Sequence, residues 1–204
     1  MITIINYGMG NLGSIANMIK RIGYSSEITS DISKIESAEK IILPGVGHFD
    51  KAMQNIVSLG LLDVIKKKAL EDKTPILGIC LGMQLMCKRS EEGRESGLEL
   101  IDAEVKKFSF PENQKLKIPH MGWNIISIVK NNSILSNMYD EPRFYFVHSY
   151  HVVCNELKDV MTTTTYGYDF HSSFAHDNIM GVQFHPEKSH KFGMLLLKNF
   201  IENF

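Results

Sequence analysis

The residue with the clearest chemical potential in this chain is Cys80, which lies between two glycines. The segment Pro75 to Met86 reads PILGICLGMQLM, so an apolar, strand-like tract turns directly into a helix-favouring tract at the cysteine. A nucleophile at such a corner, one residue removed from Gly78 and from Gly82, matches the nucleophile-elbow pattern with cysteine in place of serine. At so sharp a turn, a Cβ on either glycine is expected to clash. An isolated cysteine is more often a buried packing residue, so this interpretation depends on partner residues.

A base, and a group that can orient that base, occur in the segment His185-Pro186-Glu187. If residues 181–184 form a strand, side-chain alternation places His185 and Glu187 on the same side, where the carboxylate can orient the imidazole. A solvated turn is the ordinary explanation of a histidine near a glutamate. Combined with the Cys80 elbow, the segment instead predicts a Cys-His-Glu triad for nucleophilic catalysis.

Two other segments can supply groups to such a site. Pro44-Gly45-Val46-Gly47 is a glycine-rich loop after a predicted strand, and it can present a backbone N–H to an oxyanion, although alone it is only a turn. The N–H of Leu81, next to the nucleophile, is a second candidate donor. Gln84 lies over the same helical face as the thiol if a helix begins at Cys80. It can bind the polar end of a substrate, although an exposed helical glutamine is the more common case.

The elements that position these residues follow from the hydrophobic pattern. Short apolar tracts typical of buried strands, and apolar residues at helical spacing, alternate in the first half of the chain. The expected strands include 2–5, 40–43 and 76–79, and the expected helices include 15–22 and 61–69. This alternation predicts an α/β fold with a mostly parallel central sheet flanked by helices, with chemistry beyond the carboxyl ends of the strands. After about Gly93, β-branched and aromatic segments predict antiparallel strands and hairpins in the C-terminal half, and Ser189 is a candidate N-cap for a final helix.

Composition restricts the class of protein. The 204 residues fit a single domain, 1–204, and 22 Lys and Arg residues nearly balance 23 Asp and Glu residues, so no nucleic-acid partner is expected. No apolar run approaches the ~20 residues of a membrane span, and the first residues are strand-like rather than a signal sequence, which predicts a cytoplasmic protein without membrane contact. The 3 cysteines form no CxxC pair, and His171, His176 and His190 match no metal-ligand motif. No disulfide, metal or cofactor is predicted.

Six segments spread along nearly the whole chain carry a resemblance to a known family. In chain order they read YGMGN, PGVGHF, GICLGMQL, KIPHMGWN, YFVHSY and HPEKS. With these segments the chain resembles the class I (triad) glutamine amidotransferases. The GxCxG and HPE patterns mark the class, and YGMGN and PHMGWN narrow the resemblance to the glutaminase subunits of imidazole glycerol phosphate synthases.

The resemblance implies glutaminase chemistry at the matching residues. Cys80 would attack the side-chain amide of glutamine, His185 would act as general base and acid, and Glu187 would orient the imidazole. Ammonia would leave, and water would release glutamate from a glutamyl thioester. The peptide at Val46-Gly47 resembles the family's oxyanion strand, which becomes productive when a partner subunit is engaged.

The resemblance also implies substrate and partner contacts. The amino-acid end of glutamine would be held by Gln84 and Glu92, and the pocket would be closed by the backbone around His148, Ser149 and Tyr150. The partner would be a cyclase subunit of (β/α)8-barrel type in a heterodimer, met by Asn11, Trp123, Tyr145 and Lys188. That cyclase would use the ammonia to make imidazole glycerol phosphate and AICAR in histidine biosynthesis. Because free ammonia is mostly protonated in water at neutral pH, a shielded passage between the subunits is expected.

Other functions stay open on the sequence alone. The chain departs from the family pattern at Asn6, Gly13 and Glu99, and the first two lie in the amino-terminal loop expected to face the partner. These departures leave open an amidotransferase subunit that supplies ammonia for amidination of a surface-polysaccharide sugar. A cysteine hydrolase with the same elbow but without glutamine specificity is a further alternative. A catalytically silent regulatory subunit is disfavoured because the three triad residue types are all present.

Overall fold

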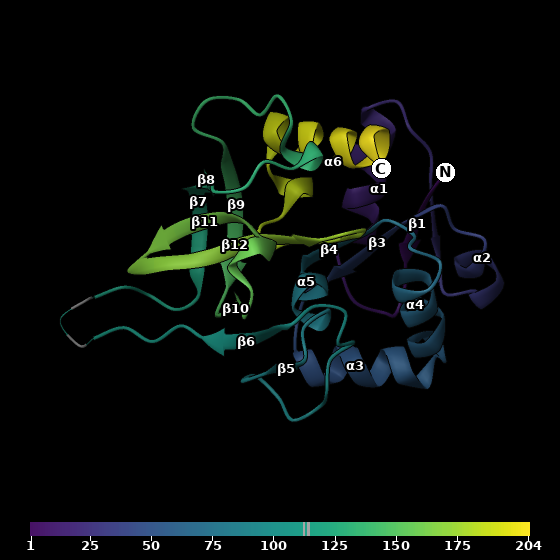
Figure 1. The fold of residues 1–204 in the computed structure, drawn as a ribbon, viewed down its shortest axis with the longest axis horizontal. Coiled ribbons are helices and arrows are strands. Elements are labelled where there is room, and N and C mark those ends of the chain that lie inside the picture. Colours follow the sequence, from purple (N-terminus) through teal and green to yellow (C-terminus); the bar gives the residue numbers. More distant parts are fainter. Residues whose placement is uncertain (112, 114) are drawn as a thin grey trace.

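The computed structural model describes residues 1–111, 113 and 115–204. Within them, an 11-stranded sheet changes from parallel to antiparallel pairing across its width (Figure 1). The parallel part has the order β2 (Ser26–Thr29), β1 (Ile2–Ile5), β3 (Lys40–Gly45), β4 (Ile76–Cys80) and β13 (Ile179–Val182). Every neighbouring pair in this part is parallel, so the carboxyl ends of these strands meet at one edge.

The sheet continues from β13 with antiparallel partners. In order these are β12 (Tyr168–His176), β10 (Tyr150–Cys154) and β6 (Ala103–Lys107), with the short strand β5 (Arg89–Ser90) parallel to β6 at the edge. Off this path, β12 forms a hairpin with β11 (Val160–Tyr166), which also pairs with β8 (Ser127–Ile128). A separate two-stranded antiparallel sheet consists of β7 (His120–Ile125) and β9 (Arg143–His148).

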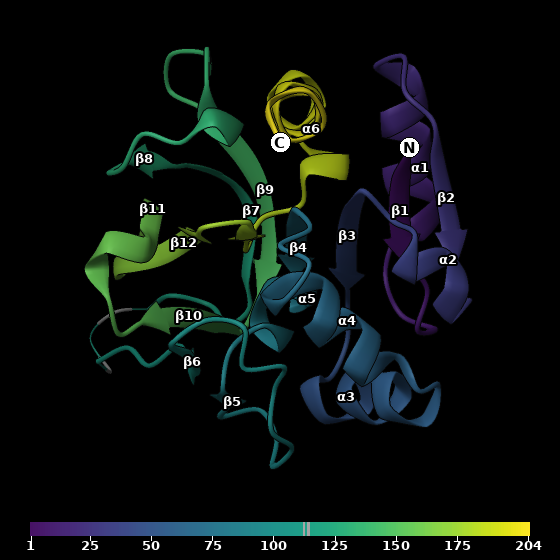
Figure 2. The same ribbon diagram turned by 45° about the vertical axis from the view of Figure 1, so that its right-hand side comes forward.

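Helices cover both faces of the parallel strands (Figure 2). One face carries α3 (Phe49–Ser58), α4 (Leu61–Leu70) and α5 (Leu81–Leu85), with α2 (Ile32–Glu36) beside α4, and the other carries α1 (Leu12–Arg21) and α6 (His190–Asn203). Short 3-10 helices occur at η1 (Ser133–Leu135), η2 (Leu157–Asp159) and η3 (Pro186–Lys188). Alternation along β3 explains the two layers, because Ile41 and Leu43 pack with α3 and α4 whereas Ile42 packs with α1 and α6.

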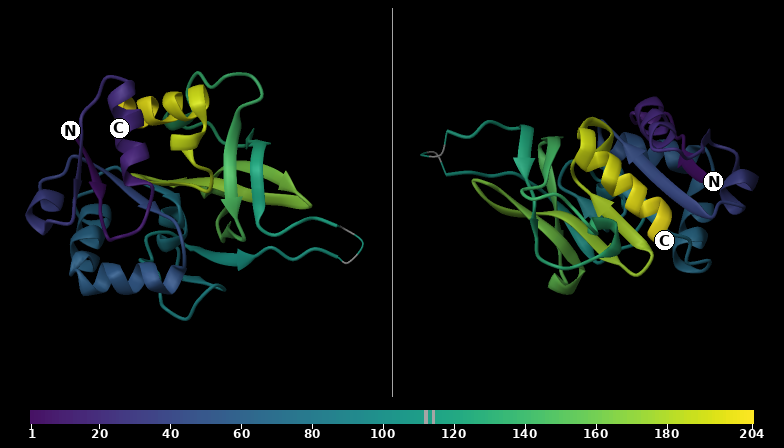
Figure 3. Two further views of the ribbon diagram at one scale, coloured as in Figure 1. Left: turned by 180° about the vertical axis from the view of Figure 1, so that it is seen from behind. Right: turned by 90° about the horizontal axis from the view of Figure 1, so that it is seen from above.

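The two halves of the chain occupy different parts of the molecule. Figure 3 shows α1 and α6 side by side over the parallel strands, while the hairpin-rich half extends beyond them. The expected α/β class, with a mostly parallel central sheet and antiparallel strands in the C-terminal half, is confirmed. None of the helices in the described part of the chain is both long and apolar enough to cross a membrane.

Two local features differ from the sequence-based expectations. Strand β12 was not predicted as a strand of its own. Its residues Ser172 and Ser173 are polar, which does not indicate a buried strand, and yet both are fully buried. Their hydroxyl groups hydrogen-bond to that of Thr162 on β11, which is why burial is tolerated there. Ser189 is the N-cap residue of α6, as expected, but its side chain makes no capping bond, since its hydroxyl donates to the backbone oxygen of His185 at 2.6 Å.

Candidate active site

The nucleophile elbow forms where β4 turns into α5. Cys80 is the last residue of β4 and has φ 54° and ψ −110°, a backbone conformation that a non-glycine residue adopts only under local constraint. The flanking glycines permit the turn because the neighbouring backbone is in contact with them. A Cβ on Gly82 would lie 1.8 Å from the backbone oxygen of Leu43, and one on Gly78 would lie 2.8 Å from the backbone of Met83. The sharp turn leaves the sulfur at the carboxyl edge of the sheet.

His185 reaches the same edge from the neighbouring strand. β13 is parallel to β4, with Val182 in register with Ile79, and residues 183 and 184 lead from the end of β13 to His185. The expected strand through residue 184 is wrong at its end, because β13 stops at Val182 and residues 186–188 form η3. It is therefore this tight turn, and not strand alternation, that brings the Glu187 carboxylate to the imidazole.

The imidazole and the carboxylate form a buried pair. Nδ1 of His185 lies 2.8 Å from Oε1 of Glu187, and both side chains are 1% exposed. Nδ2 of Asn11 donates to the same Oε1 at 3.1 Å. Because a carboxylate only accepts hydrogen bonds, Nδ1 of His185 carries a proton. The other ring nitrogen of His185, Nε2, is buried and has no hydrogen-bond partner among the described residues.

The charges in this cluster favour a protonated imidazole. Burial alone would lower the pKa of His185, but the Cys80 sulfur and the Glu187 carboxylate outweigh it and raise the pKa to about 10. Burial likewise opposes ionisation of Glu187, but the bonds from His185 and Asn11 lower its pKa. A protonated imidazole beside a sulfur favours the thiolate, which is the nucleophilic form of cysteine. The cluster is thus equipped for nucleophilic attack followed by proton donation.

A cavity of about 320 Å³ opens over the sulfur. It brings together every residue expected from the sequence to form the oxyanion and substrate sites. Its lining consists of Val46, Gly47, Cys80, Leu81, Gln84, Glu92, Pro119, Val147, His148, Ser149, Tyr150 and His185. A larger cavity of about 790 Å³, between η2 and the β11–β12 hairpin, shares none of these residues.

Gln84 is buried in the wall of this cavity, unlike the exposed glutamine that is common on helices. Its Nε2 donates to the backbone oxygen of Tyr150 at 3.1 Å and to Oε1 of Gln183 at 3.0 Å. Both amide hydrogens are therefore used, and Oε1 is the polar atom of the side chain left to bind a ligand. Gln84 can serve only as an acceptor for an N–H or O–H group.

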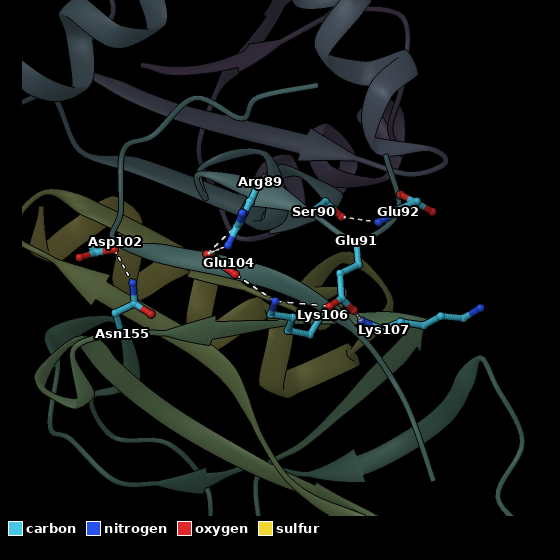
Figure 4. A network of polar contacts seen from close by, with 9 residues as sticks. All are labelled: Arg89, Ser90, Glu91, Glu92, Asp102, Glu104, Lys106, Lys107 and Asn155. Carbon is cyan, nitrogen blue, oxygen red and sulfur yellow. Dashed lines mark hydrogen bonds and ion pairs between the residues drawn. The ribbon is translucent and has the colours of Figure 1, made fainter. Parts of the chain in front are cut away.

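Glu92 lies at the other side of the cavity, in the turn after β5. Its Oε2 accepts from the backbone N–H of Phe49 at 2.8 Å, and its own N–H donates to Oγ of Ser90 at 3.1 Å. Figure 4 shows that the neighbouring Glu91 points instead to Lys106 and Lys107, within the surface network of ion pairs on β5 and β6. Glu92 takes no part in these ion pairs and lines the cavity.

The loop expected to provide the oxyanion donor begins beside the nucleophile. Gly45, the last residue of β3, is in register with Cys80, and Val46 and Gly47 follow it into the cavity. Gly47 has φ +102°, in the region that favours glycine, and a Cβ there would also lie 2.7 Å from Cε of Met9. The loop conformation therefore requires glycine at this position.

Comparison with known proteins adds an independent line of evidence. The profile of the family described as Glutamine amidotransferase class-I matches residues 3–204. The chain belongs to the class I glutamine amidotransferases. This amidotransferase is 54% identical, over 202 residues and 99% of each chain, to the imidazole glycerol phosphate synthase subunit HisH 2 of Methanococcus maripaludis. It is 46% identical, again over 202 residues and 99% of each chain, to the subunit of the same name from Pseudomonas aeruginosa.

Solved structures show the same fold at lower sequence similarity. A putative GMP synthase subunit from Thermoplasma acidophilum matches this amidotransferase with a TM-score of 0.72 and 21% identity, over 98% of this chain and 91% of that chain. At this identity the likeness supports the fold alone. The resemblance seen in the sequence is confirmed at the level of the family.

The residues expected at the partner face of this amidotransferase divide into two groups. Trp123 and Tyr145 lie opposite each other in the β7–β9 pair, and Nζ of Lys188 lies 5.6 Å from the centre of the Tyr145 ring. Trp123 is 47% exposed and is therefore not a core residue. The side chain of Asn11 forms the second group and donates to the Glu187 carboxylate.

Sequence reasoning missed several residues that surround the reactive groups. Gln183 is fully buried and its Nε2 donates to Sγ of Cys80 at 3.7 Å, and the buried Tyr7 donates to the backbone oxygen of Pro44 at 2.5 Å. The position of Gln183, two residues before His185, was the only signal for it. The other cysteines, Cys87 and Cys154, are buried and free, and burial raises the pKa of both thiols. Among the described residues, no group of three His, Cys, Asp or Glu side chains is placed to hold a metal ion.

Proposed function

We propose that residues 1–204 form one glutaminase domain, which supplies ammonia within an imidazole glycerol phosphate synthase. The observation that carries this proposal is the meeting of Cys80 and His185 in one cavity, with the Glu187 carboxylate 2.8 Å behind the imidazole. The names of the relatives that share 99% of their length with this chain support the choice of synthase.

In the reaction His185 first donates a proton and later takes one up. The Cys80 thiolate attacks the side-chain carbonyl carbon of glutamine, and the backbone N–H groups of Leu81 and of the Val46-Gly47 peptide stabilise the negative oxygen. As the carbon–nitrogen bond breaks, His185 gives its proton to the nitrogen and ammonia leaves. A water molecule then attacks the glutamyl thioester while His185 takes up its proton, so that glutamate is released and the thiolate is restored.

The polar groups of the cavity suit the amino-acid end of glutamine. The free Oε1 of Gln84 and the Glu92 carboxylate are both acceptors, so together they favour the positively charged α-ammonium group. The backbone of Ser149 and Tyr150 lines the same cavity and closes it from the opposite strand. A cavity of about 320 Å³ is also in the size range of small-molecule sites.

The ammonia would pass to a cyclase subunit of (β/α)8-barrel type. Strand β7 offers a face for such a partner, because Met121, Trp123 and Ile125 are 63%, 47% and 39% exposed on one side of it. An exposed aromatic residue within an apolar patch is typical of the centre of a protein interface. Direct transfer in the complex would keep the ammonia unprotonated and hence nucleophilic.

A second candidate is an amidotransferase subunit that serves amidination of a surface-polysaccharide sugar. It is favoured by Asn6, which stands where the family pattern has aspartate, and whose Oδ1 accepts from the N–H of Gly8 at the start of the loop leading to Asn11. Such an enzyme would use the same glutaminase half-reaction with a different acceptor. A cysteine hydrolase without glutamine specificity is the alternative outcome of the test below.

The decisive experiment replaces Cys80 by alanine in the complex with the co-purified cyclase-type partner. We expect loss of glutamine-dependent turnover, because the nucleophile is gone, while ammonium salts still support product formation at the partner. Glutamate release and formation of imidazole glycerol phosphate, or of the amidinated sugar, are measured in parallel to identify the acceptor. Continued glutamate release by Cys80→Ala would disprove the nucleophile assignment, and equal hydrolysis of unrelated amides by the parent would favour the unspecific hydrolase.

A further inference from the structure

A buried pair of histidines lies between the exposed strand β7 and the cavity. Nδ1 of His120, the first residue of β7, is 3.0 Å from Nε2 of His148, the last residue of β9. The two residues are 3% and 6% exposed. The His120 ring also stacks on Phe146 and Tyr166, with ring centres 4.9 and 4.1 Å away. These contacts fix the plane of the ring.

Backbone acceptors at both ends determine where the protons of this pair lie. Nδ1 of His148 is 2.8 Å from the backbone oxygen of Tyr150, so Nδ1 donates and Nε2 accepts. His120 must then donate from Nδ1, which leaves its Nε2 as an acceptor. Nδ2 of Asn124 donates to that nitrogen at 3.2 Å and is itself oriented by a bond to the Thr165 backbone oxygen at 3.0 Å. Both imidazoles are therefore neutral, in agreement with the lowering of their pKa by burial.

The same chain of hydrogen bonds continues to the reactive sulfur. The Tyr150 oxygen that accepts from His148 also accepts from Nε2 of Gln84, whose other hydrogen binds Oε1 of Gln183. This bond orients the Gln183 amide so that its Nε2 faces Sγ of Cys80 at 3.7 Å. The donor and acceptor of each bond are fixed by the neighbouring bonds. None of the side chains in this series of hydrogen bonds can turn without leaving a buried polar group unpaired.

We propose that Asn124, His120, His148 and Gln183 are positioning residues that form a relay from strand β7 to the glutamine site. The relay holds the Tyr150 carbonyl, the Gln84 amide and the Cys80 sulfur in one arrangement, and this role rests on the proposed glutaminase function. His120 and Asn124 do not line the cavity, so they act only through their neighbours.

The outer end of the relay lies on β7, on the side of the strand opposite to the exposed face proposed for the partner. Asn124 stands between Trp123 and Ile125, which are exposed on β7, and Pro119, directly before His120, lines the cavity. A partner that shifts β7 therefore shifts the donor to His120 and the wall of the cavity together. Through the relay, a partner bound on that face can affect the position of the Cys80 sulfur.

The test follows alkylation of Cys80 by iodoacetamide in the full chain, with peptide mapping to separate it from the other cysteines. Glutamine in the cavity protects the thiol, and the glutamine concentration for half-protection measures how well the site is formed. His120→Phe keeps the ring stacking and removes both hydrogen bonds, and we expect the half-protection concentration to rise about tenfold. His120→Asn keeps an amide donor near the Nδ1 position and should return it to within about threefold of the parent.

The matched control is His151→Phe. His151 is another buried histidine in the same aromatic cluster, with its ring 4.7 Å from that of Phe108, but its Nε2 pairs with the Tyr168 hydroxyl outside the relay. We expect half-protection to change less than about twofold in this variant, since the two hydrogen bonds removed, to the Tyr168 hydroxyl and to the Val152 backbone oxygen, lie outside the relay. An equal rise in the control and in His120→Phe would overturn the relay, because it would reflect general loosening of the cluster.

The inner end of the relay is tested with Gln183→Glu. The carboxylate keeps an acceptor for Gln84 but replaces the N–H that faces the sulfur, so alkylation without glutamine should slow about tenfold as the thiolate is disfavoured. If thermal unfolding shows that a buried variant does not fold, Asn124→Ala at the half-buried end replaces it, with an expected rise of about threefold in half-protection. Unchanged half-protection in the folded relay variants overturns the relay. A parent chain that glutamine never protects overturns the proposed glutaminase function instead.

Discussion

Replacement of Glu187 by glutamine tests how His185 is held and charged. Oε1 of Glu187 accepts from both His185 Nδ1 and Asn11 Nδ2, whereas its Oε2 has no hydrogen-bond partner in the described part of the chain. Because Asn11 offers a donor, the oxygen of the new amide is expected to stay at the Oε1 position, with the NH2 group at the unpaired position. The variant then loses the charge while His185 keeps its tautomer.

The size of the effect follows from the loss of charge. Hydrogen bonds to charged groups contribute ~1.5–3 kcal/mol, and neutral ones ~0.5–1.5 kcal/mol, so the variant loses ~1–2 kcal/mol of stabilisation of the protonated imidazole. This corresponds to a fall of about 5- to 30-fold in glutamine turnover. The pKa of His185, which Cys80 and Glu187 raise against the effect of burial, is expected to fall as well.

The double variant Asn11→Ala/Glu187→Gln tests whether the hydrogen bond from Asn11 fixes the position of the amide oxygen. Without Asn11 the amide is free to turn its NH2 group toward Nδ1, which favours the wrong tautomer of His185. In a serine protease triad a comparable exchange lowers kcat about 10⁴-fold. We therefore expect a loss of about 10³- to 10⁴-fold in the double variant, with only a few-fold loss in Asn11→Ala alone.

The assay is glutamate release by the complex, together with the pH dependence of Cys80 alkylation. The alkylation profile should shift to higher pH in Glu187→Gln, because a less stabilised imidazolium gives less support to the thiolate that reacts. Strictly additive losses in the double variant would refute the role of Asn11 as the anchor of the carboxylate oxygen. An unchanged alkylation profile in Glu187→Gln would refute the electrostatic role of Glu187.

Two further predictions concern the frame of the site and its stability in acid. In Gly82→Ala the new Cβ would lie 1.8 Å from the Leu43 carbonyl, so we expect urea denaturation to show a loss of about 3 kcal/mol and glutamate release to be abolished. Burial lowers the pKa of His120 and of His151 to about 4, below the ordinary value of 6.5, so the unfolded chain binds protons first as the pH falls. Each histidine therefore contributes on the order of 3 kcal/mol to the free energy of unfolding above pH 6.5. This contribution is lost as the pH falls through about 4. His151→Phe should therefore reduce the difference in unfolding free energy between pH 7 and pH 4, and an unchanged difference would contradict the assignment.

The parts of the molecule that depend on local sequence were predictable. Apolar periodicity placed β1, β3 and β4 but not the edge strand β2. Gly78 and Gly82 located the elbow, because a sharp turn needs small residues within two positions of the nucleophile. The end of β13 was not predictable in the same way. Pro186 starts a 3-10 turn directly after His185, and strand alternation was extended too far.

The contacts that complete the site depend on residues far apart in sequence. Gln84 is separated from Tyr150 by 66 positions and from Gln183 by 99, so neither its burial nor its acceptor role follows from the helix that carries it. Asn11 and Glu187 are 176 positions apart, and the resemblance implied a role for Asn11 at the partner face without indicating this contact. Such pairings are set by tertiary packing, which no local pattern encodes.

The β7–β9 ribbon is linked by hydrogen bonds to both reacting groups, directly to His185 and through other residues to Cys80. On one side, the backbone N–H of His185 donates to the Tyr145 oxygen of β9 at 2.9 Å, and Tyr145 lies opposite Trp123 on β7. On the other side, the relay through His120 leads to the Cys80 sulfur. If the relay acts as proposed, a displacement of the exposed face of this ribbon would be passed on to the base and to the nucleophile together. Under the proposed function, docking of a partner on that face would therefore adjust glutamine hydrolysis at the point where ammonia is needed.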